Sequence, residues 1–245
     1  MIDLELVEPD SLGRCSWEVE EARRDVEVLA WIGRFRFVTA EAIGERFGVS
    51  WQRANARVRR LERLGLVGCS REHVSQPRAV FLTGRSHELL GQPRRRAPRA
   101  QVQRDHEAAI VWLVTQLELE ADGAVRVLTE RECRRLEAAD HRGRYSVELL
   151  DRQRRWADVV VERDGRRRAV EIEFAPKGSA RLARIVEAYR YSNYDETIFF
   201  VRNGALGRRI AGVVLDVGAS SVVRVLPWPG LGVAERELLA GALAA

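Results

Sequence analysis

The chain contains very little lysine, little cysteine and no long apolar run. Lys177 is the only lysine among its 41 basic residues, so arginine supplies nearly all of the positive charge. The three cysteines, Cys15, Cys69 and Cys133, are odd in number and far apart, which fits neither a disulfide framework nor a zinc site and suits a reducing cytosol. No segment approaches the roughly 18 apolar residues of a membrane span, and the N-terminus lacks the features of a secretory signal. We therefore expect a cytoplasmic protein with no membrane partner.

The chain does contain an ordinary apolar fraction and an uneven distribution of charge. At 245 residues and 46% apolar content, it has room for one large or two small domains. The net charge is +5, but residues 21–100 carry seventeen arginines against eight acids, whereas residues 1–20 carry one arginine against six acids. The surplus of positive charge in residues 21–100 indicates a polyanionic partner, most simply nucleic acid. The alternative is a solvated, arginine-rich surface.

Two predicted helices begin the N-terminal half. The first spans residues 18–33, and Thr39 has the side chain of an N-cap for the second, which is expected to end at Phe47. A tight turn at Gly48-Val49-Ser50 follows. The apolar residues expected near one face of the first helix are Val26, Leu29, Ala30 and Ile32.

A third helix is predicted over residues 51–64, between the N-cap Ser50 and the terminating Gly65. A hairpin follows, with strands that start at Leu66 and Arg78 on either side of a polar tip. The apolar stripe of this third helix contains Ala54, Val58, Leu61 and Leu64.

Segments Phe37–Ser50 and Arg60–Val67 resemble the winged helix-turn-helix of bacterial regulators. The resemblance covers about residues 24–90 and implies a DNA-binding domain over residues 1–90, whose third helix enters the major groove of double-stranded DNA. Winged helices also mediate protein contacts, and Trp51 has the alternative of packing against its own domain. The residues implied at the DNA are Trp51, Gln52, Arg53, Asn55, Arg59 and Arg60 on the helix, and Arg71, His73 and Arg78 on or beside the wing.

Residues 91–99 contain two prolines, one glycine and four arginines, which predicts a linker. Residues 100–245 then predict a second, α/β domain. The element order α-β-β-β-α-β resembles the restriction-endonuclease-like core, which is a mixed sheet with helices on both faces. The expected elements are helices over residues 101–120, 180–190 and 206–215, and strands over residues 125–128, 156–161, 169–174, 197–201 and 222–226.

The register of two of these strands follows from Asp164-Gly165, a strong signal for a two-residue hairpin. With positions 164 and 165 at the tip, the numbers of paired residues sum to 329. Asp158 then lies opposite Glu171, and Trp156 lies opposite Glu173. Because residues two apart on a strand share a face, the three carboxylates are expected to project together.

Three carboxylates so placed, with Lys177 just beyond, predict a metal-dependent site. Opposed carboxylates repel each other unless a cation, a shared proton or water compensates, and hard oxygen ligands suit Mg²⁺ or Mn²⁺. Asp158, Glu171 and Glu173 would hold the metal, which would activate a water, and Lys177 would assist. The alternative is an acidic face that water screens. Further candidates for completing the site are His106, Glu107 and Glu130.

Asp158 followed by Glu171-Ile172-Glu173 resembles the PD-(D/E)xK nuclease motif. Ala157 stands where proline is common, and Glu173 stands where lysine is expected. Lys177 comes four residues late. The resemblance therefore implies a nuclease-like domain in which a third carboxylate replaces the lysine of the motif.

The whole arrangement, from the winged helix through the His106 helix to the segment Glu171–Lys177, is also similar to the replication-relaxation family. This resemblance spans most of residues 24–205 and implies a role on the DNA of plasmids and mobile elements. We expect a DNA-binding protein with a Mg²⁺- or Mn²⁺-dependent nicking or cleaving domain. The alternatives are a regulator or plasmid-maintenance protein without catalysis, and a C-terminal protein-interaction module. A homodimer through Leu238–Ala245 and shielding of the basic domain by Asp3–Asp10 are further possibilities.

Overall fold

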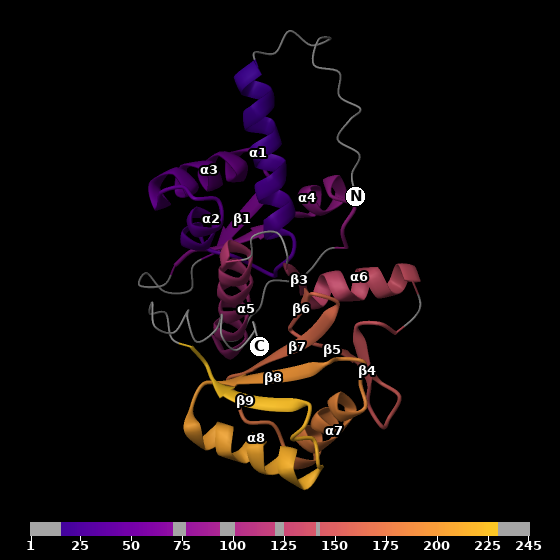
Figure 1. The fold of residues 1–245 in the computed structure, drawn as a ribbon. Coiled ribbons are helices and arrows are strands. Elements are labelled where there is room, and N and C mark those ends of the chain that lie inside the picture. The colour runs from indigo at the N-terminus through magenta and orange to yellow at the C-terminus, as the bar shows by residue number, and fades with distance from the viewer. Residues whose placement is uncertain (1–15, 71–76, 94–100, 121–124, 141–142, 230–245) are drawn as a thin grey trace. The chain divides into compact units, whose positions relative to one another are not determined.

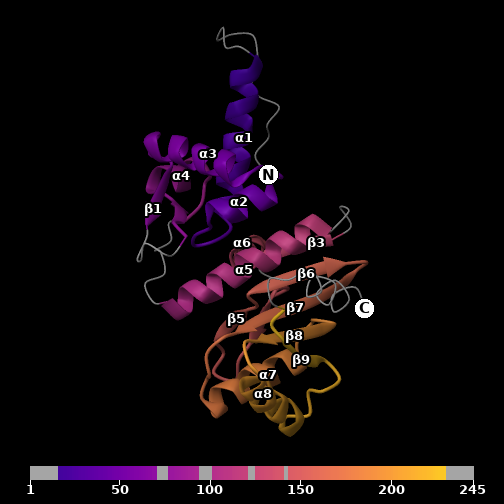
Figure 2. The same cartoon turned by 90° about the vertical axis from the view of Figure 1, so that its left-hand side faces the viewer.

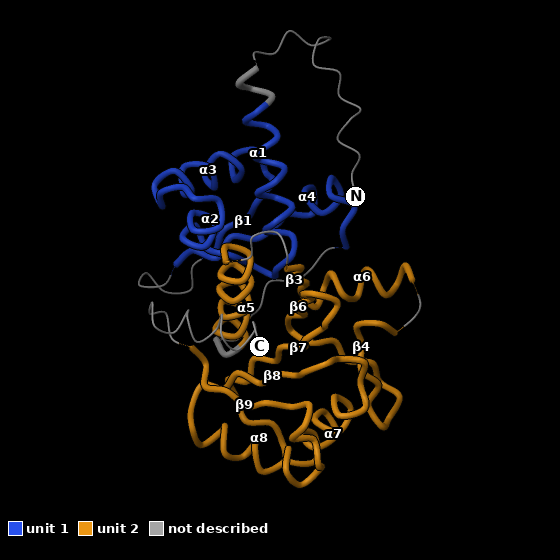
Figure 3. The backbone as a smooth tube through the Cα atoms, in the orientation of Figure 1, with its two compact units in different colours: residues 1–96 blue, residues 97–245 orange. Residues whose placement is uncertain are grey.

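The computed structural model describes residues 16–70, 77–93, 101–120, 125–140 and 143–229. The chain divides into two compact units, residues 1–96 and 97–245 (Figure 3). Both units combine helices with strands, and the larger sheet is mixed, which confirms an α/β protein. None of the described helices has the length and apolar character needed to cross a membrane. The segments Asp3–Asp10 and Leu238–Ala245 lie outside the described residues, as does most of the expected linker.

Unit 1 contains the predicted helices and hairpin. The side chain of Thr39 accepts a hydrogen bond from Ala42 N at 3.2 Å, and that of Ser50 accepts one from Arg53 N at 3.4 Å, as expected of N-caps. Gly48 has a φ of +62°, which allows the tight turn between the second and third helices. The described elements are α1 (Ser16–Ile32), α2 (Ala40–Arg46), α3 (Trp51–Arg63), β1 (Val67–Ser70), β2 (Ala79–Leu82) and the unpredicted α4 (Gly84–Leu89).

The buried face of α1 differs from the predicted one. Leu29 and Ile32 are buried as predicted, but Val26 is 42% exposed and Ala30 is exposed, whereas Val28 is buried. Asp25 is buried on the same face as Val28, and it forms ion pairs with arginines of α3. The prediction was wrong here because an aspartate was not considered as a member of a buried stripe.

Unit 2 is built around a five-stranded sheet with strand order β3-β6-β7-β8-β9. The pairs β3–β6 and β6–β7 are antiparallel, and the pairs β7–β8 and β8–β9 are parallel. Helix α5 covers one face of the sheet, and α7 and α8 cover the other (Figures 1 and 2). The described elements are α5 (Gln101–Glu120), β3 (Val125–Thr129), α6 (Glu130–Asp140), β4 (Ser146–Glu148), β5 (Arg154–Trp156), β6 (Val159–Arg163), β7 (Arg166–Glu173), α7 (Ser179–Arg190), β8 (Glu196–Val201), α8 (Gly204–Asp216) and β9 (Val223–Pro227).

The β6–β7 hairpin has the predicted register. Val159 pairs with Val170, Arg163 pairs with Arg166, and the tip residues Asp164 and Gly165 have φ values of +51° and +78°. Positive φ at both central residues is the requirement of a type I′ turn, whose twist matches that of the flanking strands. The hairpin signal in the sequence therefore fixes which residues of β7 face α7.

The strand predicted over residues 156–161 is in fact two strands in different sheets. Trp156 ends β5 and pairs with Ser146 of β4, so it does not lie opposite Glu173 as predicted. The five-stranded sheet resumes only at Val159. The intervening Ala157 and Asp158 therefore change the direction of the chain, and Asp158 stands at the start of β6 without a ladder partner.

Substituting Leu61 by alanine tests the inner face of α3. Leu61 is fully buried between α3 and the rest of unit 1, so Leu61→Ala should lower the free energy of unfolding of unit 1 by about 2–5 kcal/mol. The measurement is chemical unfolding of the full chain, followed with hydrogen exchange to assign the transition to unit 1. Arg59→Ala on the exposed face is the control, and an equal loss there would contradict the assigned faces.

Candidate functional site

The four predicted catalytic residues lie around one end of the β6–β7 pair. Asp158 precedes β6, Glu171 and Glu173 are at the C-terminal end of β7, and Lys177 is in the connection to α7. Glu171 has no exposed surface, and Glu173 is 4% exposed. Burial of this kind requires that each carboxylate charge have a partner within the protein.

Glu171 is bound by a guanidinium and a hydroxyl. Arg155 Nε donates to Glu171 Oε1 at 3.2 Å, and Arg155 Nη2 donates to Oε2 at 2.5 Å, while the Tyr189 hydroxyl donates to Oε1. The charge of Glu171 raises the pKa of Arg155, although burial opposes this, and burial raises the pKa of Tyr189 well above its ordinary value. Arg155 is therefore a permanent cation here and Tyr189 a neutral donor.

Asp158 accepts two hydrogen bonds at the same oxygen. Its Oδ2 lies 2.9 Å from Ile172 N and 3.0 Å from His106 Nε2. Burial by itself would lower the pKa of His106, but the hydrogen bond and charge of Asp158 outweigh it and raise that pKa. Burial would raise the pKa of Asp158, but its bonds to His106 and Ile172 lower it. The two residues form an imidazolium–carboxylate pair wherever both are ionised.

Lys177 contacts Glu173, four residues before it, through an ion pair of Nζ with Oε1. Burial lowers the pKa of Lys177, the charge of Glu171 opposes that change, and the charge of Arg155 reinforces it. Asp158 also acts on Lys177 electrostatically. Each of the three predicted carboxylates therefore has its own positively charged partner: His106 for Asp158, Arg155 for Glu171 and Lys177 for Glu173.

This donor set does not fit a divalent metal without rearrangement. Glu171 has both oxygens bound by Arg155, and Glu173 is bound by Lys177, so a metal would have to displace these cations. In the part of the chain that the structure describes, no three His, Cys, Asp or Glu side chains are grouped to hold a metal. The predicted Mg²⁺ or Mn²⁺ site stays a prediction.

The further candidates for completing the site are on two helices: His106 and Glu107 on α5, and Glu130 on α6. His106 contacts Asp158 directly, and the charge of Glu107 acts on His106 from the neighbouring position of α5. Glu130 begins α6, and its Oε1 pairs with Arg134 Nη2 at 2.6 Å. His106 contacts Asp158 through its side chain, and Glu130 contacts Asp158 through the backbone, where Glu130 N donates to Asp158 O at 3.1 Å.

Sequence reasoning missed Arg155 and the hydroxyl of Tyr189. The helical period of α7 does place Tyr189 on the buried face, but it carries no information about its hydrogen-bond partner. A signal existed for Arg155, because a glutamate inside a buried strand requires a nearby cation. The sequence does not say which of forty arginines supplies it.

Helix α3 presents a polar face. Trp51 is 49% exposed, Gln52, Arg53 and Arg59 are exposed, and Asn55 is half-buried. The opposite face is buried in the core of unit 1. Apart from Arg60, the predicted reading residues of the helix are therefore exposed or half-buried, and Ala54, Val58 and Leu61 of the predicted apolar stripe are buried behind them. Leu64 is 47% exposed, so the predicted stripe was wrong at that residue.

Arg60 and Arg78 are instead engaged within unit 1. Arg60 Nη1 forms ion pairs with Glu21 and, at 3.3 Å, with Asp25 Oδ2, so it faces α1. Arg78 Nη2 lies 3.0 Å from both carboxylate oxygens of Glu62. The two remaining predicted wing residues, Arg71 and His73, lie outside the described residues.

Comparison with known proteins adds no family to this picture. The chain matches no protein-family model and no curated protein. The function is therefore argued from the residues and their geometry.

The His106–Asp158 pair has a defined pH dependence. Because the pKa of His106 is raised in the folded state, its contribution to stability is complete below its ordinary value of 6.5 and is lost as the pH rises through the raised pKa. Because the pKa of Asp158 is lowered, its contribution is present above its ordinary value of 3.8 and is lost as the pH falls through the lowered pKa. The pair therefore stabilises unit 2 most between these two limits.

Replacing Asp158 by asparagine should lower the pKa of His106, because both the charge and the acceptor oxygen that raise it are reduced while burial remains. The measurement is an NMR titration of the histidine ring signals in the wild-type and Asp158→Asn chains. His87 in unit 1 is the internal reference. An unchanged or higher pKa of His106 would refute the pairing.

Proposed function

We propose that the chain is a binding protein for double-stranded DNA, in which α3 is the recognition helix of a winged helix-turn-helix. The observation that carries the proposal is that α3 is amphipathic, with one buried face and one exposed polar face. Ala54, Val58 and Leu61 are buried, whereas Gln52 and Arg53 are exposed at the N-terminal end of the helix. A recognition helix needs both a fixed inner face and an N-terminal outer face free to reach base edges.

The charge of this face supports the same proposal. Arg53 and Arg59 are exposed, and within the described residues neither forms an ion pair. Two guanidinium groups without internal partners suit phosphates or a guanine edge, and the neighbouring Gln52 and Asn55 suit an adenine edge. Trp51 is exposed beside them, so it is also available at the interface.

For unit 2 we favour a role in binding without cleavage. The carboxylate of Glu171 is fully occupied by Arg155 and Tyr189, an arrangement that neutralises its charge without a metal. The chain would then act as a regulator or plasmid-maintenance protein with a degenerate nuclease-like domain. This agrees with the resemblance to the replication-relaxation family, which implies a role on mobile-element DNA.

Metal-dependent nicking is the second candidate. It is favoured by one observation, the gathering of Asp158, Glu171, Glu173 and Lys177 at one end of a strand pair. In this candidate the carboxylates would hold Mg²⁺ or Mn²⁺ only after losing their present partners Arg155, His106 and Lys177. A metal so held would supply an activated water and stabilise charge on a phosphate.

Substituting Arg53 and Arg59 by alanine tests the DNA interface of α3. Each lost phosphate contact should reduce the slope of log binding constant against log salt by about 0.9, so the double variant should lose about 1.8 units if both contact phosphate. The measurement is fluorescence anisotropy with a duplex probe over a series of salt concentrations. An arginine bound to a guanine edge would instead weaken binding to the preferred sequence.

The matched control is the double variant Arg23→Ala and Arg24→Ala. These arginines are exposed on α1 and pair with Glu20, and the variant has the same change in net charge. An equal loss of duplex affinity and of salt slope in both variants would contradict recognition by α3.

A supercoiled-plasmid assay separates the two candidates for unit 2. The non-cleaving proposal expects no relaxed or linear product above background when Mg²⁺ or Mn²⁺ is added to the full chain. If product forms, Asp158→Ala should abolish it and leave duplex binding unchanged, because Asp158 is a predicted metal ligand and is not part of unit 1. Metal-dependent product that persists in Asp158→Ala would reject both assignments of this site.

A further inference from the structure

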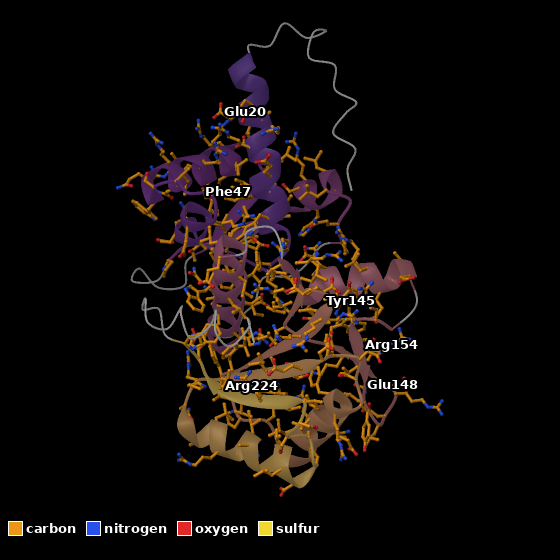
Figure 4. All side chains as sticks on the ribbon, in the orientation of Figure 1. Glu20, Phe47, Tyr145, Glu148, Arg154 and Arg224 are labelled. Atoms are coloured by element: carbon orange, nitrogen blue, oxygen red, sulfur yellow. The ribbon has the colours of Figure 1, made fainter. Side chains whose placement is uncertain are left out.

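A cleft in unit 2 has no role in the proposed duplex interface. It has a volume of about 310 Å³ and is bounded by the start of α6, by strand β5 with the segment before it, and by the first turns of α7. Asp158 lies in its lining, so the cleft opens beside the cluster of paired carboxylates. Figure 4 labels Arg154 on the β4–β5 side of this unit.

Arginine dominates the lining. The lining has five basic and three acidic residues, which is an excess of two positive charges. The basic residues are Arg134, Arg154, Arg155, Arg181 and Arg184, and the acidic residues are Glu130, Asp151 and Asp158.

Ion pairs within the described part of the protein account for every charged residue of the lining except Arg154 and Arg181, which therefore carry the excess positive charge. Arg134 pairs with Glu130, Arg184 Nη1 lies 3.6 Å from Asp151, and Arg155 binds Glu171. Asp158 is matched by His106. Arg154 and Arg181 are exposed, and neither has an ion-pair partner among the described residues. The unbalanced charge of the cleft is therefore presented by two guanidinium groups that are accessible from solvent.

The wall beside these groups is held in place. Trp156 Nε1 donates to Glu137, and the guanidinium of Arg134 lies 4.0 Å from the centre of the indole ring. Glu137 also accepts hydrogen bonds from the backbone of Tyr145 and from Ser146. Leu149 and Ile185 add apolar surface to the lining. The cleft thus combines fixed apolar and aromatic surface with free guanidinium groups.

We propose that this cleft binds one nucleotide of single-stranded DNA, with its phosphate on Arg154 and Arg181. Guanidinium groups bind phosphate through paired hydrogen bonds, and a positive groove beside aromatic or apolar surface is the common way to hold a single strand. The volume is at the lower end of the roughly 300–1,000 Å³ of ligand sites, which suits a single nucleotide and not a base pair.

This inference does not depend on duplex binding by α3. The cleft and its arginines belong wholly to unit 2, and α3 belongs to unit 1. A chain that binds a single strand in unit 2 and a duplex in unit 1 would hold DNA at a place where the two strands are separated. Failure of either interface leaves a measurable signal from the other.

The test measures binding of a labelled oligothymidylate to the full chain and to the double variant Arg154→Ala and Arg181→Ala. Both side chains are exposed, so the variant should fold. Loss of two charged hydrogen-bonding groups should weaken binding by about tenfold or more. The slope of log binding constant against log salt should fall by about 0.7 units, because both groups hold the same phosphate and each single-strand phosphate contact contributes about 0.7.

Two control variants locate the effect. Arg208→Ala with Arg224→Ala removes two exposed arginines of unit 2 that do not line the cleft, and it should leave the oligothymidylate affinity within about twofold of wild type. Arg224 lies on β9 (Figure 4). Arg53→Ala with Arg59→Ala should weaken duplex binding and not oligothymidylate binding.

Competitors identify the ligand. Unlabelled oligothymidylate should displace the probe at far lower concentration than inorganic phosphate. A blunt duplex should not displace it, because the duplex is expected to bind unit 1 and the cleft belongs to unit 2. Equal weakening by the cleft and control variants would overturn the proposal. Displacement by inorganic phosphate as effective as by oligothymidylate would also overturn it, since the cleft would then be a simple anion site.

Discussion

Glu171 has no contact with water, and the organisation of unit 2 around it follows from that constraint. Removing an ionised carboxylate from water costs several kcal/mol unless a cation and hydrogen bonds replace the solvent. Arg155 from β5 and Tyr189 from α7 provide these bonds. One side chain of β7 thereby joins three elements that are separate in the sequence. Removing Arg155 alone would leave an uncompensated buried charge, so these elements depend on each other.

The same constraint accounts for the break in the chain before β6. If Trp156 and Arg155 continued β6 in the same register, Arg155 would pair with Phe174 and would project from the other face of the sheet than Glu171. Because β5 pairs with β4 instead, Arg155 lies outside this ladder and its guanidinium reaches Glu171. Asp158 lies between β5 and β6, and its side chain accepts a hydrogen bond from the backbone N–H of Ile172. The N–H of Ile172 has no partner on β6, and the side chain of Asp158, where the ladder ends, accepts its hydrogen bond instead.

Local signals in the sequence predicted most of the elements, and the failures have identifiable physical causes. The caps Thr39 and Ser50 and the hairpin tip at Asp164 act through neighbours in the chain, so their outcome can be read from the sequence. The division of residues 154–161 into two strands, and the choice of Arg155 as partner of Glu171, depend on long-range packing. The register of β6 and β7 was predictable from the hairpin signal, but the cations that pair with the carboxylates were not. The burial of Asp25 was also missed, because an acidic residue is expected at the surface and the sequence does not show that Arg57 and Arg60 pair with it.

Because the chain has a single lysine, Lys177, reagents specific for lysine act at one known side chain. A lysine-specific protease has one target bond in the whole sequence, after Lys177, in the connection between β7 and α7. Lys177 is half-buried and pairs with Glu173, and this burial lowers the pKa of its amine. Cleavage there requires local opening of this connection, so the rate of appearance of two fragments would report how often the carboxylate cluster opens. Acylation of the same amine would report its protonation without interference from any other side-chain ammonium group.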